Sequence, residues 1–374
     1  MKKKKLVRMC GVVMCAAMMF SGCGSTATDT KGQESEQTEA MAQESEQTDA
    51  SVSETAEVQK DEKTAVAAQE ETASGSYETV TIQNYNLETT YEQKPEKIVT
   101  LSLNSAEIVA ALGAADSIAA VQTNNNLLTD VLPEYYEMLK DVNVPEELNN
   151  GMPPTLEAML SQEPDLVSMN SYYFYVPTFG TVEDYQANNV NLYITEGSYV
   201  EACTIENTYN DIRNLGAILG ASEKAEELIM DMQTRIASVE SAVSAEEKVK
   251  VMAFDSMSDN LFTIAGGSGL ENSLLNMAGV ENVFADVESD FSTVSMEKII
   301  ERNPEVIIIH NYTTEENNAQ SKIDYLLSQE ELSGVTAIQN ESFIIVNLFQ
   351  VNPGIQNVDF VETVAKYTHP EAFK

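Results

Sequence analysis

The sequence predicts an α/β fold of two Rossmann-like lobes with parallel sheets, joined by a single long helix. Three observations predict it. From about residue 97, short apolar strands alternate with helices, which is the order of parallel βαβ units. The same alternation returns after residue 248, and one amphipathic helix separates the two halves. Residues 78–374 are numerous enough to bury two modest cores.

In the first half, Tyr77 to Leu87 alternates apolar and polar side chains, which is typical of a small antiparallel edge strand. Short apolar runs then predict buried strands, and stretches ended by Gly113 and by Pro164 predict helices. The predicted strands are 97–101, 116–121, 165–169 and 190–195, and the predicted helices are 105–112 and 155–162. These elements make an N-terminal lobe, predicted over 78–221.

The second half repeats this pattern and predicts a C-terminal lobe over 246–374. Its predicted strands are 249–254, 305–310 and 342–347, and its predicted helices are 269–278 and 295–302. Between the lobes, apolar residues at helical spacing predict a connecting helix over 222–245, with Ser222 as its N-cap. A junction made of one rigid helix predicts limited hinge motion.

One unit occurs in both halves. Thr155 to Val167 and Ser295 to Ile307 each read as a helix with a glutamate in its first turn, then a proline, an acidic residue and an apolar strand. This match predicts a supersecondary unit that is used once in each lobe.

The N-terminus predicts export. Lysines and an arginine precede Met9 to Phe20, an apolar run too short to span a bilayer as a helix, so residues 1–22 are a predicted signal peptide. The run ends in Phe20-Ser21-Gly22-Cys23, which resembles the lipobox of bacterial lipoproteins. Cys23 is therefore the predicted lipid-attachment site and ties the chain to a membrane. The alternative is an ordinary signal peptide with a chance cysteine.

Residues 23–77 predict a disordered acidic tether. From residue 24 the segment has no Leu, Ile or Phe and carries 13 acidic against three basic residues, so it has too little apolar surface to fold. Such a tether indicates the outer face of a Gram-positive cell membrane. After removal of the signal peptide and lipidation of Cys23, Cys203 is the one cysteine left with a free thiol, which excludes an intrachain disulfide. We expect it to be a buried apolar residue rather than a nucleophile.

Composition excludes two function classes. The net charge of −39 argues against nucleic acid as a partner, because phosphate binding needs a basic face. No serine-hydrolase elbow, Cys/His pair or zinc-protease motif occurs, so we expect no enzyme and no catalytic residues. With two histidines in the chain, we expect no resident metal and no cofactor.

Several segments resemble one family in their order and spacing. They are Pro95 to Ser102, Ser105 to Ile108, Ala111 to Asp116, Thr155 to Val167, Ile212 to Gly220 and Ala278 to Phe284. Over about residues 95–374 the chain looks like the substrate-binding lipoproteins of ABC importers for iron–siderophore complexes, heme and vitamin B12. The resemblance implies an extracytoplasmic monomer that captures a metal chelate and works with a permease and its ATPase. The alternatives are a heme receptor, or a sensory or adhesion lipoprotein without transport.

In this family, one glutamate on each lobe meets basic residues of the permease. The matching positions here are Glu157 and Glu297, the glutamates of the repeated unit. Two carboxylates on separate lobes suit docking onto arginines. The alternative is that each glutamate only complements the positive end of its own helix.

The ligand cleft is expected between the lobes, at the carboxyl ends of the strands. The resemblance implies a set of polar and aromatic cleft residues, which suit a flat or apolar chelate. The predicted ligand-binding residues are Asn124, Tyr172, Tyr173, Phe262, Phe291, His310 and Phe349. His310 is either an axial metal ligand or a hydrogen-bonded strand-end residue. Gly266 to Gly269 either presents amides to an anion or forms a tight turn.

Arginine is scarce after the tether. Arg213, Arg235 and Arg302 all fall in helices with structural roles, whereas anionic chelates are commonly gripped by guanidinium groups. The sequence therefore predicts a neutral or cationic chelate, such as a hydroxamate complex or a corrinoid. Heme is less favoured because its propionates also require cations.

Overall fold

The computed structural model describes residues 77–123, 126–258, 261–313 and 318–374. The predicted signal peptide, Cys23 and the predicted tether up to residue 76 lie outside the described residues. Within the described ranges, no helix is long and apolar enough to cross a membrane. Cys203 is buried, as predicted, and burial raises the pKa of its thiol to about 12.

The N-terminal lobe is built on a parallel sheet with strand order β4-β3-β5-β6. Its strands are β3 (Ile98–Thr100), β4 (Ile118–Val121), β5 (Leu166–Met169) and β6 (Asn191–Ile194). Each lies within a predicted range, so these predictions are confirmed. The strands are short, apolar and almost wholly buried, as expected where helices cover both faces of a parallel sheet.

Helices and a hairpin complete this lobe. The helices are α1 (Leu103–Ala111), α2 (Pro133–Leu139), α3 (Leu156–Leu160), α4 (Val182–Ala187) and α5 (Ile205–Ile218). The antiparallel edge strand predicted over 77–87 is confirmed in part by β1 (Val80–Asn84), but it is shorter than predicted. It forms a hairpin with β2 (Leu87–Tyr91), which was not predicted. The hairpin turns at Tyr85 and Asn86, with φ values of 50° and 60°. Tyrosine rarely adopts this backbone region, so the turn carries no usual sequence signal.

The C-terminal lobe has a mixed sheet rather than the parallel sheet that was predicted. Its order is β10-β8-β7-β11-β12, with β9 also paired to β7. The strands are β7 (Val249–Ser258), β8 (Leu261–Ala265), β9 (Val280–Asn282), β10 (Phe291–Ser295), β11 (Val306–Asn311) and β12 (Phe343–Asn347). β9, β11 and β12 extend the sheet parallel to β7, whereas β8 runs antiparallel to both of its neighbours, β7 and β10. β8 follows β7 after two residues, which is too short for a parallel crossover.

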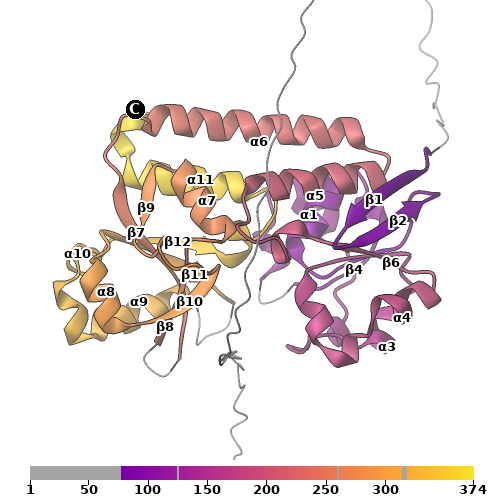
Figure 1. Ribbon diagram of the computed structural model, residues 1–374, viewed down its shortest axis with the longest axis horizontal. Helices are drawn as coiled ribbons and strands as arrows, with labels where there is room; N and C mark the ends of the chain where they lie inside the picture. The colour runs from indigo at the N-terminus through magenta and orange to yellow at the C-terminus, as the bar shows by residue number, and fades with distance from the viewer. Residues whose placement is uncertain (1–76, 124–125, 259–260, 314–317) are drawn as a thin grey trace, which may run out of the picture. The chain divides into compact units, whose positions relative to one another are not determined.

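The helices of the C-terminal lobe pack around this sheet. They are α7 (Leu270–Met277), α8 (Met296–Arg302), α9 (Ala319–Ser328), α10 (Thr336–Gln339) and α11 (Asn357–Thr368). Of these, α7 and α8 correspond to the predicted helices at 269–278 and 295–302. Figure 1 shows α7 and α11 between the sheet and the long helix α6 (Ser222–Val243).

The long helix α6 lies where the connecting helix was predicted. It packs on α5 of the N-terminal lobe and on α7 and α11 of the C-terminal lobe (Figure 1). Its buried side chains are those of the predicted apolar stripe: Ala225, Ile229, Met232, Ile236, Val239 and Val243. The predicted N-cap is wrong, since Ala221 occupies this position and no side chain caps the helix.

The lobes share more than this helix. One buried apolar cluster includes residues of both lobes, among them Ile212, Ile229 and Phe360. Polar contacts also join the lobes, since Gln356 Nε2 donates to Glu107 Oε1 over 2.9 Å and Asn104 Nδ2 donates to the Phe349 carbonyl over 2.7 Å. The lobe limits at 221 and 246 stay predictions, as does limited hinge motion, which the shared core favours.

Candidate functional site

A cleft of about 590 Å³ lies between the two lobes. It is formed mainly by the segments that follow β3, β5 and β6 in one lobe and β11 and β12 in the other. The described lining is Ser102, Leu103, Asn104, Asn126, Asn170, Ser171, Tyr172, Tyr173, Tyr175, Thr195, Gly197, Ser198, Asp290, Tyr312, Leu348, Asn352 and Pro353. The cleft therefore occupies the position that the sequence predicted, at the carboxyl ends of the parallel strands.

The N-terminal wall of the cleft carries tyrosines on a short 3-10 helix, Ser171–Tyr175, directly after β5. Asn170 starts this helix by accepting a hydrogen bond of 3.0 Å from the amide of Tyr172. The side chains of Tyr172 and Tyr175 are 57% and 79% exposed, whereas Tyr173 is buried and its hydroxyl donates to Gln122 Oε1. This wall thus offers two exposed aromatic rings above a fixed third one.

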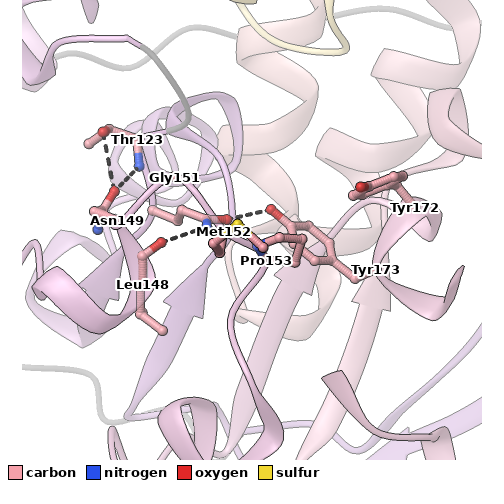
Figure 2. Close-up of a pocket in the computed structure, with 9 residues that line it drawn as sticks. Thr123, Leu148, Asn149, Gly151, Met152, Pro153, Tyr172 and Tyr173 are labelled. Atoms are coloured by element: carbon pink, nitrogen blue, oxygen red, sulfur yellow. Dashed lines mark hydrogen bonds between the residues drawn. The ribbon is translucent and has the colours of Figure 1, made fainter. Parts of the chain in front are cut away.

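A second pocket of about 260 Å³ adjoins this wall and shares Tyr172 and Tyr173 with the cleft (Figure 2). Gln122 is held there between Tyr173 and the carbonyl of Leu148, to which its Nε2 donates over 2.5 Å. Asn149 Oδ1 accepts from the amide of Thr123 over 2.8 Å. Gln122, Thr123, Asn149 and Tyr173 in this lining are neutral and are held by hydrogen bonds.

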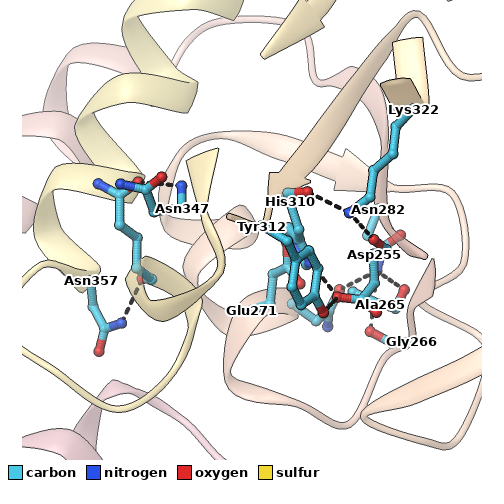
Figure 3. A network of polar contacts seen from close by, with 12 residues as sticks. Asp255, Ala265, Gly266, Glu271, Asn282, His310, Tyr312, Lys322, Asn347 and Asn357 are labelled. Atoms are coloured by element: carbon cyan, nitrogen blue, oxygen red, sulfur yellow. Dashed lines mark hydrogen bonds and ion pairs between the residues drawn. The ribbon is translucent and has the colours of Figure 1, made fainter. Parts of the chain in front are cut away.

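The C-terminal wall is backed by a buried charged network (Figure 3). His310 lies between two carboxylates, with Nε2 2.9 Å from Glu271 Oε1 and Nδ1 3.2 Å from Asp255 Oδ1. The hydroxyl of Tyr312 donates to Asp255 Oδ1 over 2.6 Å. Lys322 Nζ donates to the carbonyls of His310, over 2.6 Å, and of Asp255. The network joins β7, α7, β11 and α9.

Charge pairing decides the protonation states in this network. Burial alone lowers the pKa of a histidine, but Glu271 and Asp255 raise the pKa of His310 to about 9. Burial raises the pKa of a carboxyl group, but the hydrogen bond and charge of His310 lower the pKa of Asp255 to about 2. Burial lowers the pKa of Lys322 to about 8. At neutral pH, His310 is therefore an imidazolium.

This arrangement corrects the metal-ligand hypothesis for His310. Its side chain has no exposed surface, and both ring nitrogens already face carboxylates. A metal ligand needs a free nitrogen lone pair, which an imidazolium lacks. Across the described ranges, no cluster of three or more His, Cys, Asp or Glu side chains is arranged to hold a metal ion.

The structure brings two of the seven predicted ligand-binding residues to the cleft. Tyr172 and Tyr173 line it, and their contact with a ligand stays a prediction. Phe262 is fully buried in the core of the C-terminal lobe beside Phe254 and Tyr325. Phe349 is buried as well.

Two predicted ligand-binding residues remain, Phe291 and Asn124, and the structure describes only the first. Phe291 is partly buried and places its ring edge-on to His310, with 6.2 Å between the ring centroids. It does not line the described cleft. Asn124 lies outside the described residues.

Several lining residues were missed by the sequence analysis. Asn104, Asn170 and Tyr312 each follow a predicted strand within three residues, and Thr195 is the last residue of one, so the strand-end rule alone points to all four. Asp290 precedes β10, a strand that was not predicted, and no sequence signal marks it.

The lining of the cleft holds no lysine or arginine among its described residues. The three arginines form ion pairs elsewhere, as their predicted structural roles require: Arg213 with Glu226, Arg235 with Asp359 and Glu362, and Arg302 with Asp286. The charged side chain in this lining is Asp290. Although part of it is exposed, lost solvation and the Glu271 carboxylate raise its pKa to about 6.

The glycine-rich segment before α7 forms a turn in which the amides of its first three residues are already bonded. The amides of Gly266, Gly267 and Ser268 donate to the carbonyls of Asp290, Val287 and Ser289. A Cβ atom on Gly269 would lie 1.6 Å from Asp290 Oδ1, so a larger residue here would displace the Asp290 side chain. Three of the four amides are therefore unavailable to an anion, which favours the tight-turn alternative.

Glu157 and Glu297 are exposed in the first turns of α3 and α8. Neither forms an ion pair with another described residue. A hydrogen bond from Ser295 lowers the pKa of Glu297. Both positions remain compatible with docking and with simple stabilisation of the helix.

Comparison with known proteins gives consistent results. The family profile described as "Periplasmic binding protein" matches residues 98–347. An uncharacterized ABC transporter substrate-binding lipoprotein of Bacillus subtilis, YvrC, is 23% identical over 381 residues and 99% of both chains. The vitamin B12-binding protein of Salmonella typhimurium is 27% identical over 213 residues, which are 57% of this chain and 71% of that protein.

A solved structure shares the fold. The crystal structure of an ABC-type Fe3+-hydroxamate transport system from Saccharomonospora viridis superposes with a TM-score of 0.64 at 22% identity. The match covers 78% of this chain and 99% of that chain.

Proposed function

Because the chain belongs to the periplasmic binding protein family, we propose that it is the substrate-binding lipoprotein of an ABC importer. It captures a metal chelate outside the cytoplasm and delivers it to a permease driven by an ATPase. The observation that carries this proposal is the open cleft between two lobes, at the carboxyl ends of their parallel strands. Likeness over nearly the whole length to YvrC, which is named a substrate-binding lipoprotein, supports it.

The lining of the cleft favours a neutral or cationic chelate. Tyrosine, asparagine and serine side chains dominate it, Asp290 adds a carboxylate, and no described lining residue is a cation. A polyanionic chelate would find no guanidinium or ammonium group to pair with. A ferric hydroxamate complex or a corrinoid fits these walls, and the relatives named for Fe3+-hydroxamate transport and vitamin B12 binding agree with both classes. Heme is less well suited, because its propionates need cations.

The volume of the cleft is that of a small-molecule site. About 590 Å³ falls within the roughly 300–1,000 Å³ that such pockets usually have. The smaller pocket beside Tyr172 and Tyr173 adds room for a polar arm of the ligand.

Ligand binding is tested by a thermal-shift screen of the full chain. We expect cyanocobalamin or ferric desferrioxamine B to raise the melting temperature, and a ferric tris-catecholate trianion to leave it unchanged. A ligand at 100 times its Kd adds about 2.7 kcal/mol to the free energy of unfolding, a readily measured gain. The chain has no tryptophan, so quenching of tyrosine fluorescence gives an independent titration. The absence of any shift by corrinoids, hemin and ferric hydroxamates would contradict the proposal.

The docking role of Glu157 and Glu297 has its own test. The double variant Glu157→Lys/Glu297→Lys should abolish chelate uptake by cells and leave the Kd of the isolated chain unchanged, because both residues lie outside the cleft lining. Glu223→Lys is the matched control, since Glu223 is also exposed in the first turn of a helix. Full uptake by the double variant would contradict the docking role and would leave stabilisation of each helix as the role of the two glutamates.

The lipid anchor is proposed at Cys23, with the segment after it as a tether. Cys23→Ser should release the protein from the membrane fraction into the medium, because the acyl chains that hold it can no longer be attached. Retention of this variant in the membrane would contradict lipidation at Cys23.

A further inference from the structure

We infer that Tyr312 is a ligand-contacting residue of the cleft and that Asp255, His310 and Lys322 are positioning residues that hold its ring in place. The inference deepens the proposed function and rests on it. The sequence resemblance did not imply Tyr312 as a ligand-binding residue. Its position in the structure points to this role.

Tyr312 is placed at the cleft by the centre of the C-terminal sheet. It directly follows Asn311, the last residue of β11, which is hydrogen-bonded to β7 on one side and β12 on the other. Its side chain lines the cleft together with Tyr172 and Tyr175 of the other lobe. Aromatic rings from both lobes therefore border the same space, which suits a chelate with flat or apolar faces.

Two contacts restrain the ring of Tyr312. Its hydroxyl donates to Asp255 Oδ1 over 2.6 Å, and Lys322 Nζ lies 4.3 Å from the ring centroid. A cation at this distance is attracted to the ring face. One edge and one face of the ring thus contact the protein, and Tyr312 also lines the cleft.

The groups that hold the ring are themselves fixed. Asp255 is bonded to His310, and His310 is bonded to Glu271, so the phenol is the end of a continuous chain of charged contacts. Lys322 donates to the carbonyls of Asp255 and His310 and is almost fully buried. His310 forms buried ion pairs with Asp255 and Glu271, and separating these groups leaves a buried charge without its partner. Rearrangement of this wall is therefore costly.

The opposite wall differs. Tyr172 and Tyr175 are largely exposed, and no described side chain bonds to either hydroxyl. The hydroxyls of these two tyrosines are therefore not anchored to the protein, although the ring of Tyr172 packs edge-on against Tyr173, whereas the hydroxyl of Tyr312 is bonded to Asp255. A ring that needs no ordering on binding contributes more of its contact energy to affinity. Tyr312 is therefore held in place before a ligand binds, and Tyr172 and Tyr175 of the other lobe adjust to the ligand.

The test uses the full chain with cyanocobalamin and ferric desferrioxamine B as probes. We expect Tyr312→Ala to weaken the Kd of the bound probe at least tenfold. Tyr312→Phe keeps the ring and loses the bond to Asp255, so its Kd should rise only a few-fold. Tyr325→Ala is the matched control, because Tyr325 is also half-buried in the C-terminal lobe but does not line the cleft, and its Kd should equal that of the wild type.

A spectroscopic readout separates contact from a merely structural role. In chain labelled with 3-fluorotyrosine, the 19F resonance that disappears in Tyr312→Phe is assigned to Tyr312. Saturating probe should shift this resonance, and in His310→Gln the free protein should show it broadened, because the ring has lost its support. This readout also decides the matter if Tyr312→Ala does not fold.

The outcomes distinguish the two proposals. Wild-type binding of a probe with an unchanged Kd in Tyr312→Ala, or with a Tyr312 resonance that does not move, overturns the role of Tyr312 and leaves the proposed function intact. A sharp, unshifted resonance in free His310→Gln overturns the positioning role. Failure of the wild type to bind either probe or hemin overturns the proposed function, and the role of Tyr312 falls with it.

Discussion

The repeated helix–strand unit allows the two lobes to be compared position by position. At the amino end of its strand the unit is the same in both. Asp165, just before β5, accepts hydrogen bonds from the amides of Glu96 and Lys97 over 2.7 and 3.1 Å. Glu305, just before β11, accepts one from the amide of Lys250 over 2.9 Å. In each lobe this carboxylate ties the strand to the start of its neighbour.

At the carboxyl end the two units diverge. β5 leads into Asn170, the exposed Tyr172 and Tyr175, and the buried Tyr173, whose hydroxyl donates to the neutral Gln122. β11 carries the buried charged residue His310 and leads into Tyr312. The amino end of the strand, which is the same in both units, holds the sheet together. The carboxyl end, which differs, lines the cleft and can therefore determine which ligand binds.

The largest expected effect comes from breaking the charged network. His310→Gln leaves Asp255 and Glu271 without their cation, which should lower the free energy of unfolding by about 3–5 kcal/mol. On the opposite wall, Gln122→Ala removes a neutral side chain that bonds to Tyr173 and to the Leu148 carbonyl. It should lower the free energy of unfolding by about 1–3 kcal/mol. Urea denaturation at pH 7 measures both. Equal losses of unfolding free energy in the two variants would mean that the charged network stabilises the protein no more than the neutral hydrogen bonds do.

The pH dependence sharpens this contrast. Folded His310 has a pKa of about 9 against an ordinary value of 6.5, so its stabilisation is complete below pH 6.5 and is lost as the pH rises through 9. The difference in unfolding free energy between wild type and His310→Gln should therefore shrink by about 3 kcal/mol between pH 6.5 and 9.5. A difference that stays constant over this range would contradict a charged His310.

Other groups titrate in the same pH range. The quantity to measure is therefore the difference in unfolding free energy between the wild type and His310→Gln. Burial raises the pKa of Glu107 to about 7 and of Asp211 to about 8, and both shifts lower stability as the pH rises toward those values. Lys322 acts in the opposite sense. Because its folded pKa is about 8 and its ordinary value 10.5, stability rises again between these two values.

Much of the fold was predictable from sequence because its parallel strands are continuous apolar runs between helices. The mixed part of the C-terminal sheet was not, since β8 and β10 are short and partly polar. Phe262 illustrates the limit within the site. It lies inside β8, where Leu261 is exposed and Phe262 faces the core, and only the pairing of β8 with β7 decides which side is buried.

His310 shows a second limit. Its strand end was recognised, but its partners are Glu271, 39 residues earlier, and Asp255, 55 residues earlier. No local pattern reveals that two carboxylates from other elements meet the same imidazole. Tyr312, in contrast, follows the strand end by one residue and was accessible to the same rule that located the cleft.

The shared carboxylates should respond alike. Asp165→Asn and Glu305→Gln each remove the charge that accepts the amide bonds and keep the shape of the side chain. We expect each to lower the free energy of unfolding by about 1 kcal/mol, because both sites are partly solvated. Glu371→Gln, on an exposed residue near the C-terminus, is the control and should have little effect. A loss confined to one lobe would show that the repeat is one of sequence and not of energetics.

The smallest effect comes from exchanging one residue of the repeat for its counterpart. The helix of each unit ends in a left-handed residue, Glu163 with a φ of 50° in one lobe and Asn303 with a φ of 45° in the other. Asparagine tolerates this conformation better than glutamate. Glu163→Asn should therefore raise the free energy of unfolding by about 0.5 kcal/mol, since the ion pair it gives up with Lys97 is exposed and contributes little.

The reverse exchange tests the same reasoning from the other lobe. Asn303→Glu should destabilise by more than Glu163→Asn stabilises, because Asn303 Oδ1 also accepts a hydrogen bond of 2.8 Å from the amide of Thr336. Both changes are measured by urea denaturation in high salt, which suppresses the Lys97–Glu163 attraction. Loss of stability in Glu163→Asn under these conditions would show that the backbone conformation at this turn does not limit the stability of the N-terminal unit.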